Sequence, residues 1–234
     1  YRPINIHERS TYFQGNNTVR SISNRDSDFV ESLKSCNFRK IYGLISRSNM
    51  KKDFGSKSWL YPMPVLIVAA YDEQGVPNVM NAAWGGMFTD ETIGICLSAG
   101  HKTTKNILAT RAFTVSMATV DQVAACDYAG IVSGNKVPDK FARAGFHATP
   151  SAHVNAPMID ELPMTLECEL LSYDPASCHL TGRIVNISAD ESILTDGQID
   201  LRKLRPISFD PIHLEYIELG ATVDKAFSCG KKLK

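Results

Sequence analysis

From Lys51 onward, apolar positions recur at the short spacings that are typical of β-strands. Residues 65–70 form a continuous apolar run, and the two prolines of residues 61–64 fix an extended entry to it. Residues 164–170 instead alternate apolar with polar side chains, which predicts a strand with one wet face. The same kinds of pattern predict further strands at residues 78–83, 93–98, 113–117, 179–188 and 207–219, the last with an irregularity at Pro211.

Helices are predicted in only two places between these strands. The first is residues 103–110, and the second comprises residues 122–128, which Asp121 can cap, and a short turn from residue 139. Residues 72–75 end in glycine and predict a hairpin turn. Six or more short strands joined mainly by turns favour a mainly β fold, and specifically a closed antiparallel barrel.

Residues 1–49 differ from the rest of the chain. They are rich in Ser, Asn and Arg, and they carry eight basic residues against four acidic ones. We therefore predict an N-terminal extension of uncertain structure at residues 1–49 and one patterned domain at residues 50–234. Met50 is a plausible original start, and residues 10–15 bear a slight resemblance to the end of a protease-cleavable tag.

Composition narrows the class of protein. With 44% hydrophobic and 21% charged residues, the chain can bury the core of an ordinary globular domain. Lys and Arg balance Asp and Glu at 25 each, so no net charge directs the chain to nucleic acid or to an anionic membrane. No apolar run is long enough to span a bilayer and no secretory signal is present, which favours a cytoplasmic location.

The six cysteines are scattered without a C-x-x-C pair, and no histidine is spaced to complete a metal site. Cys96 and Cys168 lie among apolar residues and are predicted to be buried thiols. A redox-active dithiol would need two cysteines to meet in space, which the sequence cannot show.

The residues that suggest chemistry lie between positions 76 and 107. Residues 98–106 form a polar, basic loop in front of a predicted helix, and no carboxylate occurs between Glu91 and Asp121, so an anion would be favoured there. Just before it, residues 81–83 have little side-chain bulk, so their backbone could approach a flat ring, with Trp84 as a wall. An ordinary strand end with a buried tryptophan and a solvated turn is an equally good interpretation of the composition.

Sequence motifs exclude several activities. The chain has no G-x-G-x-x-G fingerprint, P-loop, G-x-S-x-G elbow or H-E-x-x-H. We therefore predict no hydrolytic activity and no metal site, and we name no catalytic side chain. Residues 133–136 could contact an anion or a ring, but a surface loop is the favoured interpretation.

Several segments together resemble one family. They are residues 59–65 (WLYPMPV), 78–84 (NVMNAAW), 98–106 (SAGHKTTKN), 127–134 (DYAGIVSG) with 139–141 (DKF), 179–184 (HLTGRI) and 219–227. In this order and spacing the chain resembles flavoredoxin and the flavin-reductase-like proteins of the FMN-binding split-barrel fold. The resemblance begins near Met50 and gives residues 1–49 no role.

The resemblance implies an antiparallel split β-barrel with a few short helices, assembled as a homodimer with one FMN per barrel. It implies that Asn81, Ala82, Ala83 and Trp84 contact the flavin ring. It also implies that Ser98, His101, Lys102, Thr103 and Asn106 hold the ribityl phosphate. Electrons would pass through the bound FMN, from NAD(P)H or from a redox protein.

Two alternatives remain open from the sequence. One is a non-enzymatic carrier or sensor module that retains flavin or haem on the same barrel. The other is a structural barrel whose site is empty.

Overall fold

The computed structural model describes residues 51–233. Contacts divide the chain into two units, Tyr1–Ser56 and Lys57–Lys234. Of the first unit, residues 51–56 are described, and they are exposed and form neither helix nor strand. The predicted domain boundary, between residues 49 and 50, lies outside the described residues, so it stays a prediction.

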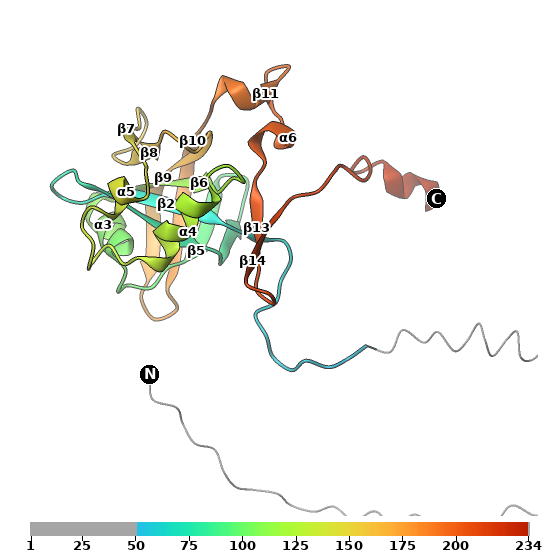
Figure 1. The fold of residues 1–234 in the computed structure, drawn as a ribbon, viewed down its shortest axis with the longest axis horizontal. Coiled ribbons are helices and arrows are strands. Elements are labelled where there is room, and N and C mark those ends of the chain that lie inside the picture. The colour runs from blue at the N-terminus through green and yellow to red at the C-terminus, as the bar shows by residue number, and fades with distance from the viewer. Residues whose placement is uncertain (1–50, 234) are drawn as a thin grey trace, which may run out of the picture. The chain divides into compact units, whose positions relative to one another are not determined.

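The second unit is built on one antiparallel sheet of seven strands (Figure 1). Their order across the sheet is β3-β2-β6-β9-β10-β5-β4. In chain order they are β2 (Leu66–Tyr71), β3 (Pro77–Ala82), β4 (Gly85–Met87), β5 (Thr92–Cys96), β6 (Ala112–Met117), β9 (Met164–Asp174) and β10 (His179–Ala189). Six of the predicted strands lie in this sheet, and β4 is an additional one.

The sheet curls because its long central hairpin is irregular. The β9–β10 register shifts between Thr181 and Gly182 and again between Ile184 and Asn186, and such bulges bend a strand. Within residues 51–233 no pairing joins the outer strands β3 and β4. The closed barrel expected from the number of strands is therefore wrong, and the molecule has the open, split form of a half-barrel.

Shorter elements complete the unit. A three-stranded sheet contains β1 (Met63–Pro64), β13 (Ile207–Asp210) and β14 (Glu215–Glu218). There are also two small two-stranded sheets. One pairs β7 (Ala148–Pro150) with β8 (Pro157–Ile159), and the other pairs β11 (Leu194–Thr195) with β12 (Gln198–Ile199). The helices are α3 (Lys102–Thr110), α4 (Val123–Ile131), α5 (Lys140–Arg143) and α6 (Leu201–Leu204), with 3₁₀ turns η1 (Glu191–Ile193) and η2 (Cys229–Leu233). None of the helices within residues 51–233 is long and apolar enough to cross a membrane.

Two details of the prediction are corrected by these elements. Residues 207–219 are a β13–β14 hairpin with Pro211 in its turn, not one strand. Asp121 does not cap α4: the N-cap is Gln122 without a side-chain hydrogen bond, and Asp121 pairs with Arg205 at 3.0 Å. The cap prediction failed because a distant arginine competes for the carboxylate.

The core has two parts, one on each face of β2. Leu66 and Val68 pack in a cluster with Phe113 of β6, whereas Ile67 and Ala69 pack on the opposite face in a cluster that includes α4 and α5. Burial on both faces explains why β2 is apolar throughout instead of alternating. Each fully buried large side chain contributes about 1.5–3 kcal/mol, so β2 is a rigid base for the neighbouring edge strand β3.

Candidate functional site

Two adjoining cavities lie along β3, where the sheet is open. The first, here called the edge cavity, has a volume of about 350 Å³. It is lined by Met80, Asn81, Ala82, Ala83, Trp84, Cys96, Ser98, His101 and Cys178.

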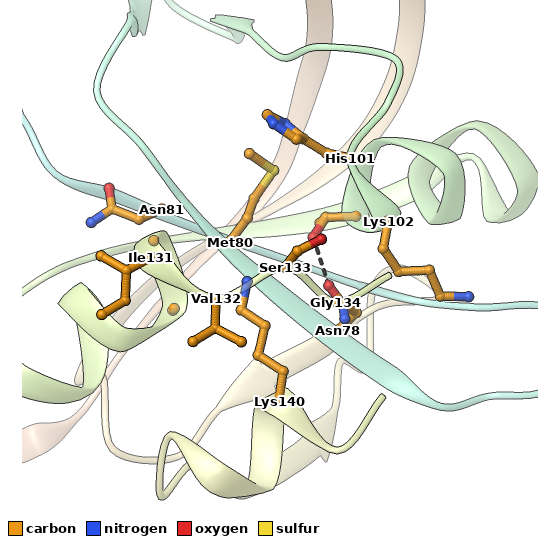
Figure 2. Close-up of a pocket in the computed structure, with 13 residues that line it drawn as sticks. Asn78, Met80, Asn81, His101, Lys102, Ile131, Val132, Ser133, Gly134 and Lys140 are labelled. Carbon is orange, nitrogen blue, oxygen red and sulfur yellow. Dashed lines mark hydrogen bonds between the residues drawn. The ribbon is translucent and has the colours of Figure 1, made fainter. Parts of the chain in front are cut away.

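The second, here called the helix cavity, has a volume of about 180 Å³. It is lined by Asn78, Met80, Asn81, His101, Lys102, Thr103, Ala129, Gly130, Ile131, Val132, Ser133, Gly134 and Lys140 (Figure 2). The linings of the two cavities share Met80, Asn81 and His101, so the cavities adjoin, and together they are here called the groove.

The N-terminus of α3 forms one wall of the helix cavity. His101 is the N-cap, in an extended conformation, and makes no side-chain capping hydrogen bond. The N–H of Lys105 donates to the His101 carbonyl at 3.2 Å, and the three N–H groups before it lack partners within the helix. These groups and the helix dipole make this wall attractive to an anion.

Lys140 of α5 brings a cation into the same cavity. The residue is 3% exposed, and Figure 2 shows its side chain running from α5 toward residues 132–134. Its ammonium group has no hydrogen bond or ion pair with any residue from 51 to 233. Burial lowers the pKa of Lys140 to about 8, so the group is still mostly protonated at pH 7.

Lys102 is not the free cation that the local sequence indicated. Its ammonium lies 3.2 Å from the Asp72 carboxylate in the turn between β2 and β3. The charge argument considered only residues 91–121 and therefore missed a carboxylate supplied from an earlier hairpin. Lys102 still lines the helix cavity, but part of its charge is already balanced.

Thr103 and Asn78 form the floor of the helix cavity. The Thr103 hydroxyl donates to the Asn78 side-chain oxygen at 2.9 Å, and both residues are buried. Gly134 packs directly on this pair, since a Cβ atom there would lie 2.3 Å from Asn78 Nδ2. A glycine at this position therefore allows residues 133–136 to approach β3 closely.

Residues 133–136, predicted to be a surface loop, belong to the site. Ser133 and Gly134 line the helix cavity. Asn135 donates through its side chain to the Gly100 carbonyl at 2.9 Å, which ties this loop to the one before α3. The loop is partly exposed, as expected, but it also forms a side of the cavity.

The edge cavity is formed by small residues and one large ring. Ala82 and Ala83 present backbone and methyl groups, and Trp84 is 57% exposed. The interpretation of Trp84 as a buried core residue is therefore wrong. The N–H of Cys96 donates to the Trp84 carbonyl at 2.8 Å, which fixes the β3–β4 connection against β5.

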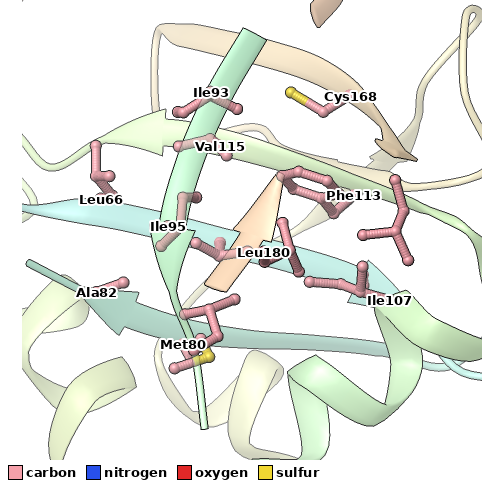
Figure 3. Close-up of a cluster of buried hydrophobic side chains, with 14 of the residues drawn as sticks. Leu66, Met80, Ala82, Ile93, Ile95, Ile107, Phe113, Val115, Cys168 and Leu180 are labelled. Carbon is pink, nitrogen blue, oxygen red and sulfur yellow. The ribbon is translucent and has the colours of Figure 1, made fainter. Parts of the chain in front are cut away.

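A packed core holds the cavity walls in place (Figure 3). Met80 and Ala82 of β3, Ile95 of β5 and Ile107 of α3 all belong to one buried cluster. Because interiors are close-packed, these three elements cannot shift independently. The shape of the groove is thus set by the fold.

Eight of the nine residues expected to bind a cofactor line the groove. Asn81, Ala82, Ala83, Trp84, Ser98 and His101 line the edge cavity, and Lys102 and Thr103 line the helix cavity. The structure does not bring Asn106 to either: it is 3% exposed, and its amide donates to the Ala70 carbonyl at 3.3 Å. Asn106 follows α3 into the core, where it ties the helix to β2.

Sequence reasoning missed Asn78 and Lys140 as site residues. Asn78 lies within a predicted strand, and its polar side chain on that otherwise apolar edge was the available signal. Lys140 precedes Phe141 in a short helical turn, and nothing in that pattern shows that both side chains are buried. Only the packing of α5 against β3 brings Lys140 into the cavity.

The arrangement suits a flat molecule that carries an anionic group. The edge cavity offers bare backbone and an aromatic wall, and the helix cavity offers an unpaired ammonium and free N–H groups. A family model described as flavin reductase like domain matches residues 58–205. The chain belongs to the flavin reductase-like family. The resemblance seen in the sequence is confirmed.

Solved structures of this family share the fold. Flavoredoxin of Desulfovibrio vulgaris (Miyazaki F) is 38% identical, with a TM-score of 0.74, and the match covers 77% of this chain and 100% of that one. Flavoredoxin from Methanosarcina acetivorans is 25% identical, with a TM-score of 0.72 and coverages of 79% and 100%.

An FMN-binding domain of a flavin reductases-like enzyme from Shewanella baltica OS155 is 20% identical, with a TM-score of 0.62 and coverages of 69% and 88%. At that identity the match bears on the fold alone. The antiparallel split barrel of the flavin reductase-like family is therefore the fold of this chain.

Proposed function

We propose that this protein binds FMN in the groove along β3 and transfers electrons through it. The observation that carries the proposal is the shared wall of the two cavities, which joins an uncharged, aromatic end to a cationic end. FMN has the same polarity, with a flat ring at one end and a phosphate at the other.

The residues present fit this group. The isoalloxazine would occupy the edge cavity, against the backbone of Ala82 and Ala83 and beside Trp84. The phosphate would occupy the helix cavity, where Lys140 lacks an anion and α3 offers its uncapped N–H groups. Lys102 would add a second cation, and Thr103 would add its backbone N–H at the start of α3, because its hydroxyl already donates to Asn78.

When bound, FMN supplies one- and two-electron redox chemistry, and the protein supplies position and electrostatics. Backbone N–H groups of residues 81–84 would donate to polar atoms of the ring edge. The cationic helix cavity would hold the phosphate and so orient the ring. No side chain is assigned as an acid or a base.

The D. vulgaris relative is named a flavoredoxin, and the S. baltica relative is named an FMN-binding domain. From the family resemblance noted in the sequence, we further propose NAD(P)H or a redox protein as the electron partner and a homodimer as the assembly. The unpaired edge strand β4, which carries exposed Met87 next to Phe88, supports such an assembly. The cytoplasmic location stays a prediction from the sequence.

The visible absorption spectrum of the purified protein is the decisive experiment. We expect the two absorption bands of oxidised flavin, and bleaching when NADPH or a chemical reductant is added without oxygen. A flavin spectrum that dithionite but neither nicotinamide nucleotide bleaches would favour a redox protein as the donor. A haem spectrum, or a colourless protein that FMN does not stabilise against heat, would contradict the proposal.

Two variants test the orientation of FMN. Lys102→Ala with Thr103→Ala should weaken FMN binding by about 2–4 kcal/mol in total, because the first change removes a cation beside the phosphate and the second removes the hydrogen bond that holds the start of α3 to Asn78. Trp84→Ala should alter flavin fluorescence while largely preserving affinity. If Trp84→Ala instead weakens binding and the Lys102 and Thr103 changes alter only flavin fluorescence, the orientation is reversed, with the ring in the helix cavity and the phosphate in the edge cavity.

A further inference from the structure

Two cysteine thiols line the edge cavity. Cys96 ends β5, and Cys178 lies in the turn that leads into β10. Both are half-buried, and both line the cavity that contains Ala82, Ala83 and Trp84. The sequence had suggested that Cys96 is buried in the core, and the structure corrects this.

The β5–β10 ladder places the two cysteines next to each other. Cys96 pairs with His179, and the N–H of Leu97 donates to the Cys178 carbonyl at 2.8 Å. The hydroxyl of Tyr173 donates to the Leu97 carbonyl at 2.9 Å, which fixes this end of the ladder.

Strand geometry allows these cysteines to be joined. With a rise of about 3.4 Å per residue and about 5 Å between paired Cα atoms, neighbouring diagonal Cα atoms are about 6 Å apart. That is within the range of about 4.4–6.8 Å for disulfides. Cys178 has φ 61°, a left-handed conformation that breaks strand alternation, so its side chain need not face away from that of Cys96.

The other described cysteines are differently placed. Cys126 and Cys168 are buried, and burial raises the pKa of each thiol to about 12. Cys229 is exposed in η2 and lines neither cavity of the groove. Among residues 51–233, only Cys96 and Cys178 are both accessible from the groove and near each other.

We propose that Cys96 and Cys178 form a reversible disulfide in the wall of the edge cavity, and that reduced flavin in this cavity is its reductant. The inference rests on the proposed function, since the flavin is the electron donor. It adds a thiol–disulfide activity to the flavin site.

The reaction is balanced without a further reactant. The two-electron-reduced flavin gives up two electrons and two protons and becomes oxidised. The S–S bond between Cys96 and Cys178 breaks, and each sulfur gains one hydrogen to become a thiol. The reverse reaction, or exchange with a small disulfide such as oxidised glutathione, restores the disulfide.

The first experiment counts thiols and needs no flavin. The full-length protein with Cys36→Ser and Cys229→Ser retains Cys96, Cys178 and the two buried cysteines, Cys126 and Cys168. It is prepared free of flavin and equilibrated with buffers of increasing ratio of oxidised to reduced glutathione. Free thiols are alkylated and counted by intact mass. We expect two thiols to disappear together, and peptide mapping to join Cys96 to Cys178.

Single variants serve as controls for this count. Cys96→Ser and Cys178→Ser, each made in the same background, should no longer lose two thiols together. If these serine variants melt at a lower temperature than the parent, Cys96→Ala and Cys178→Ala take their place as controls. If the parent forms no internal disulfide at any glutathione ratio, or one that uses Cys126 or Cys168, the proposal is overturned.

The second experiment tests coupling to the flavin. Protein carrying FMN and the disulfide is fully oxidised, given one equivalent of two-electron reductant without oxygen, and quenched by alkylation. We expect two more free thiols per protein than before reduction and an oxidised flavin spectrum, whereas Cys96→Ser should retain reduced flavin. Persistent reduced flavin beside an intact disulfide would overturn the coupling.

The two proposals fail in distinguishable ways. If the protein has no affinity for FMN, the absorption spectrum shows it, and the proposed function falls together with the role of flavin as reductant. If FMN binds normally but the thiol count never falls in pairs, the proposed function stands and the disulfide does not exist.

Discussion

A buried ammonium group is costly unless it has a counter-ion, and Lys140 has none among residues 51–233. Its pKa of about 8, lowered by burial from 10.5, measures that cost. At about 1.4 kcal/mol per pKa unit, the folded protein loses about 3 kcal/mol at neutral pH by keeping the group charged. A bound phosphate would offset this cost, so a buried lysine at this position favours an anion-binding site.

Replacing Lys140 should therefore separate stability from binding. Lys140→Met keeps much of the apolar stem, and we expect it to raise the unfolding free energy of the FMN-free protein by about 1–3 kcal/mol. FMN affinity should fall about 10- to 100-fold, because a charge-assisted contact is lost. Chemical denaturation and fluorescence titration measure the two quantities. Lys136→Met, in the adjoining loop and outside the groove, is the matched control.

The same lysine predicts a pH dependence of binding. Above pH 8 the free protein loses the Lys140 proton, so FMN affinity should decline as pH rises from 8 to 9.5, and the Lys140→Met variant should not show this decline. Stability responds in the opposite sense. Between pH 8 and 10.5 the unfolded lysine binds more protons than the folded one, so the wild-type protein gains stability relative to the variant. A flat binding profile would exclude Lys140 from the phosphate site.

At the scale of elements, the groove depends on how closely residues 133–136 and α3 approach β3. Gly134 lies against Asn78, and Asn78 in turn accepts the hydrogen bond from Thr103 at the start of α3. The contact between Gly134 and Asn78 affects the cavity even if neither of these two residues touches a ligand. The spacing of the loop sets the spacing of the helix cavity.

Gly134→Ala tests this spacing. The added methyl group would lie 2.3 Å from Asn78 Nδ2, so the loop or the Asn78–Thr103 pair must move. We expect destabilisation of about 1–3 kcal/mol and at least tenfold weaker FMN binding. Gly86→Ala, whose methyl group would meet nothing within 4 Å, is the matched control, on β4 at the other edge of the sheet. Equal effects of the two changes on binding would show that loop spacing is unimportant.

These elements also show where sequence reasoning succeeds. The bare 81–83 segment and the start of α3 were predictable, because the determinants of each are local: side-chain size, helix start signals and the spacing of apolar residues. The contributions of Asp72, Asn78 and Lys140 were not, because each depends on contact between segments far apart in the chain. Asn106 was assigned to the site because it lies in the matching motif, whereas helical periodicity turns it toward β2.

For the whole molecule, the antiparallel strands that make up most of the main sheet could be predicted but not how the sheet ends. Strand patterns give local conformation, whereas closure depends on bulges and on pairing across residues far apart, such as the register shift at Gly182. The sheet therefore keeps two open edges, β3 and β4. The edge cavity lies along β3, so the proposed cofactor site lies at one of these two open edges.

An unpaired edge strand with exposed apolar side chains favours association with a second copy. On β4, Met87 is 55% exposed, and the adjacent Phe88 is 62% exposed although its ring covers Gly94. We expect the protein to be a homodimer in solution, and Met87→Lys to weaken it by about 10- to 100-fold, because the substitution places a charge in the apolar contact. Analytical ultracentrifugation over a range of concentrations measures the dissociation constant.

Leu171→Lys is the matched control for that variant, since Leu171 on β9 is similarly exposed, at 48%, and lines neither cavity of the groove. If both substitutions leave the dimer intact, β4 is not its interface, and if the wild-type protein is monomeric at every concentration, the homodimer is wrong. A dimer formed through β4 would cover the face next to Trp84 and restrict access to the edge cavity. Dissociation by Met87→Lys should then also speed quenching of flavin fluorescence by iodide, which a dimer formed through another surface would not show.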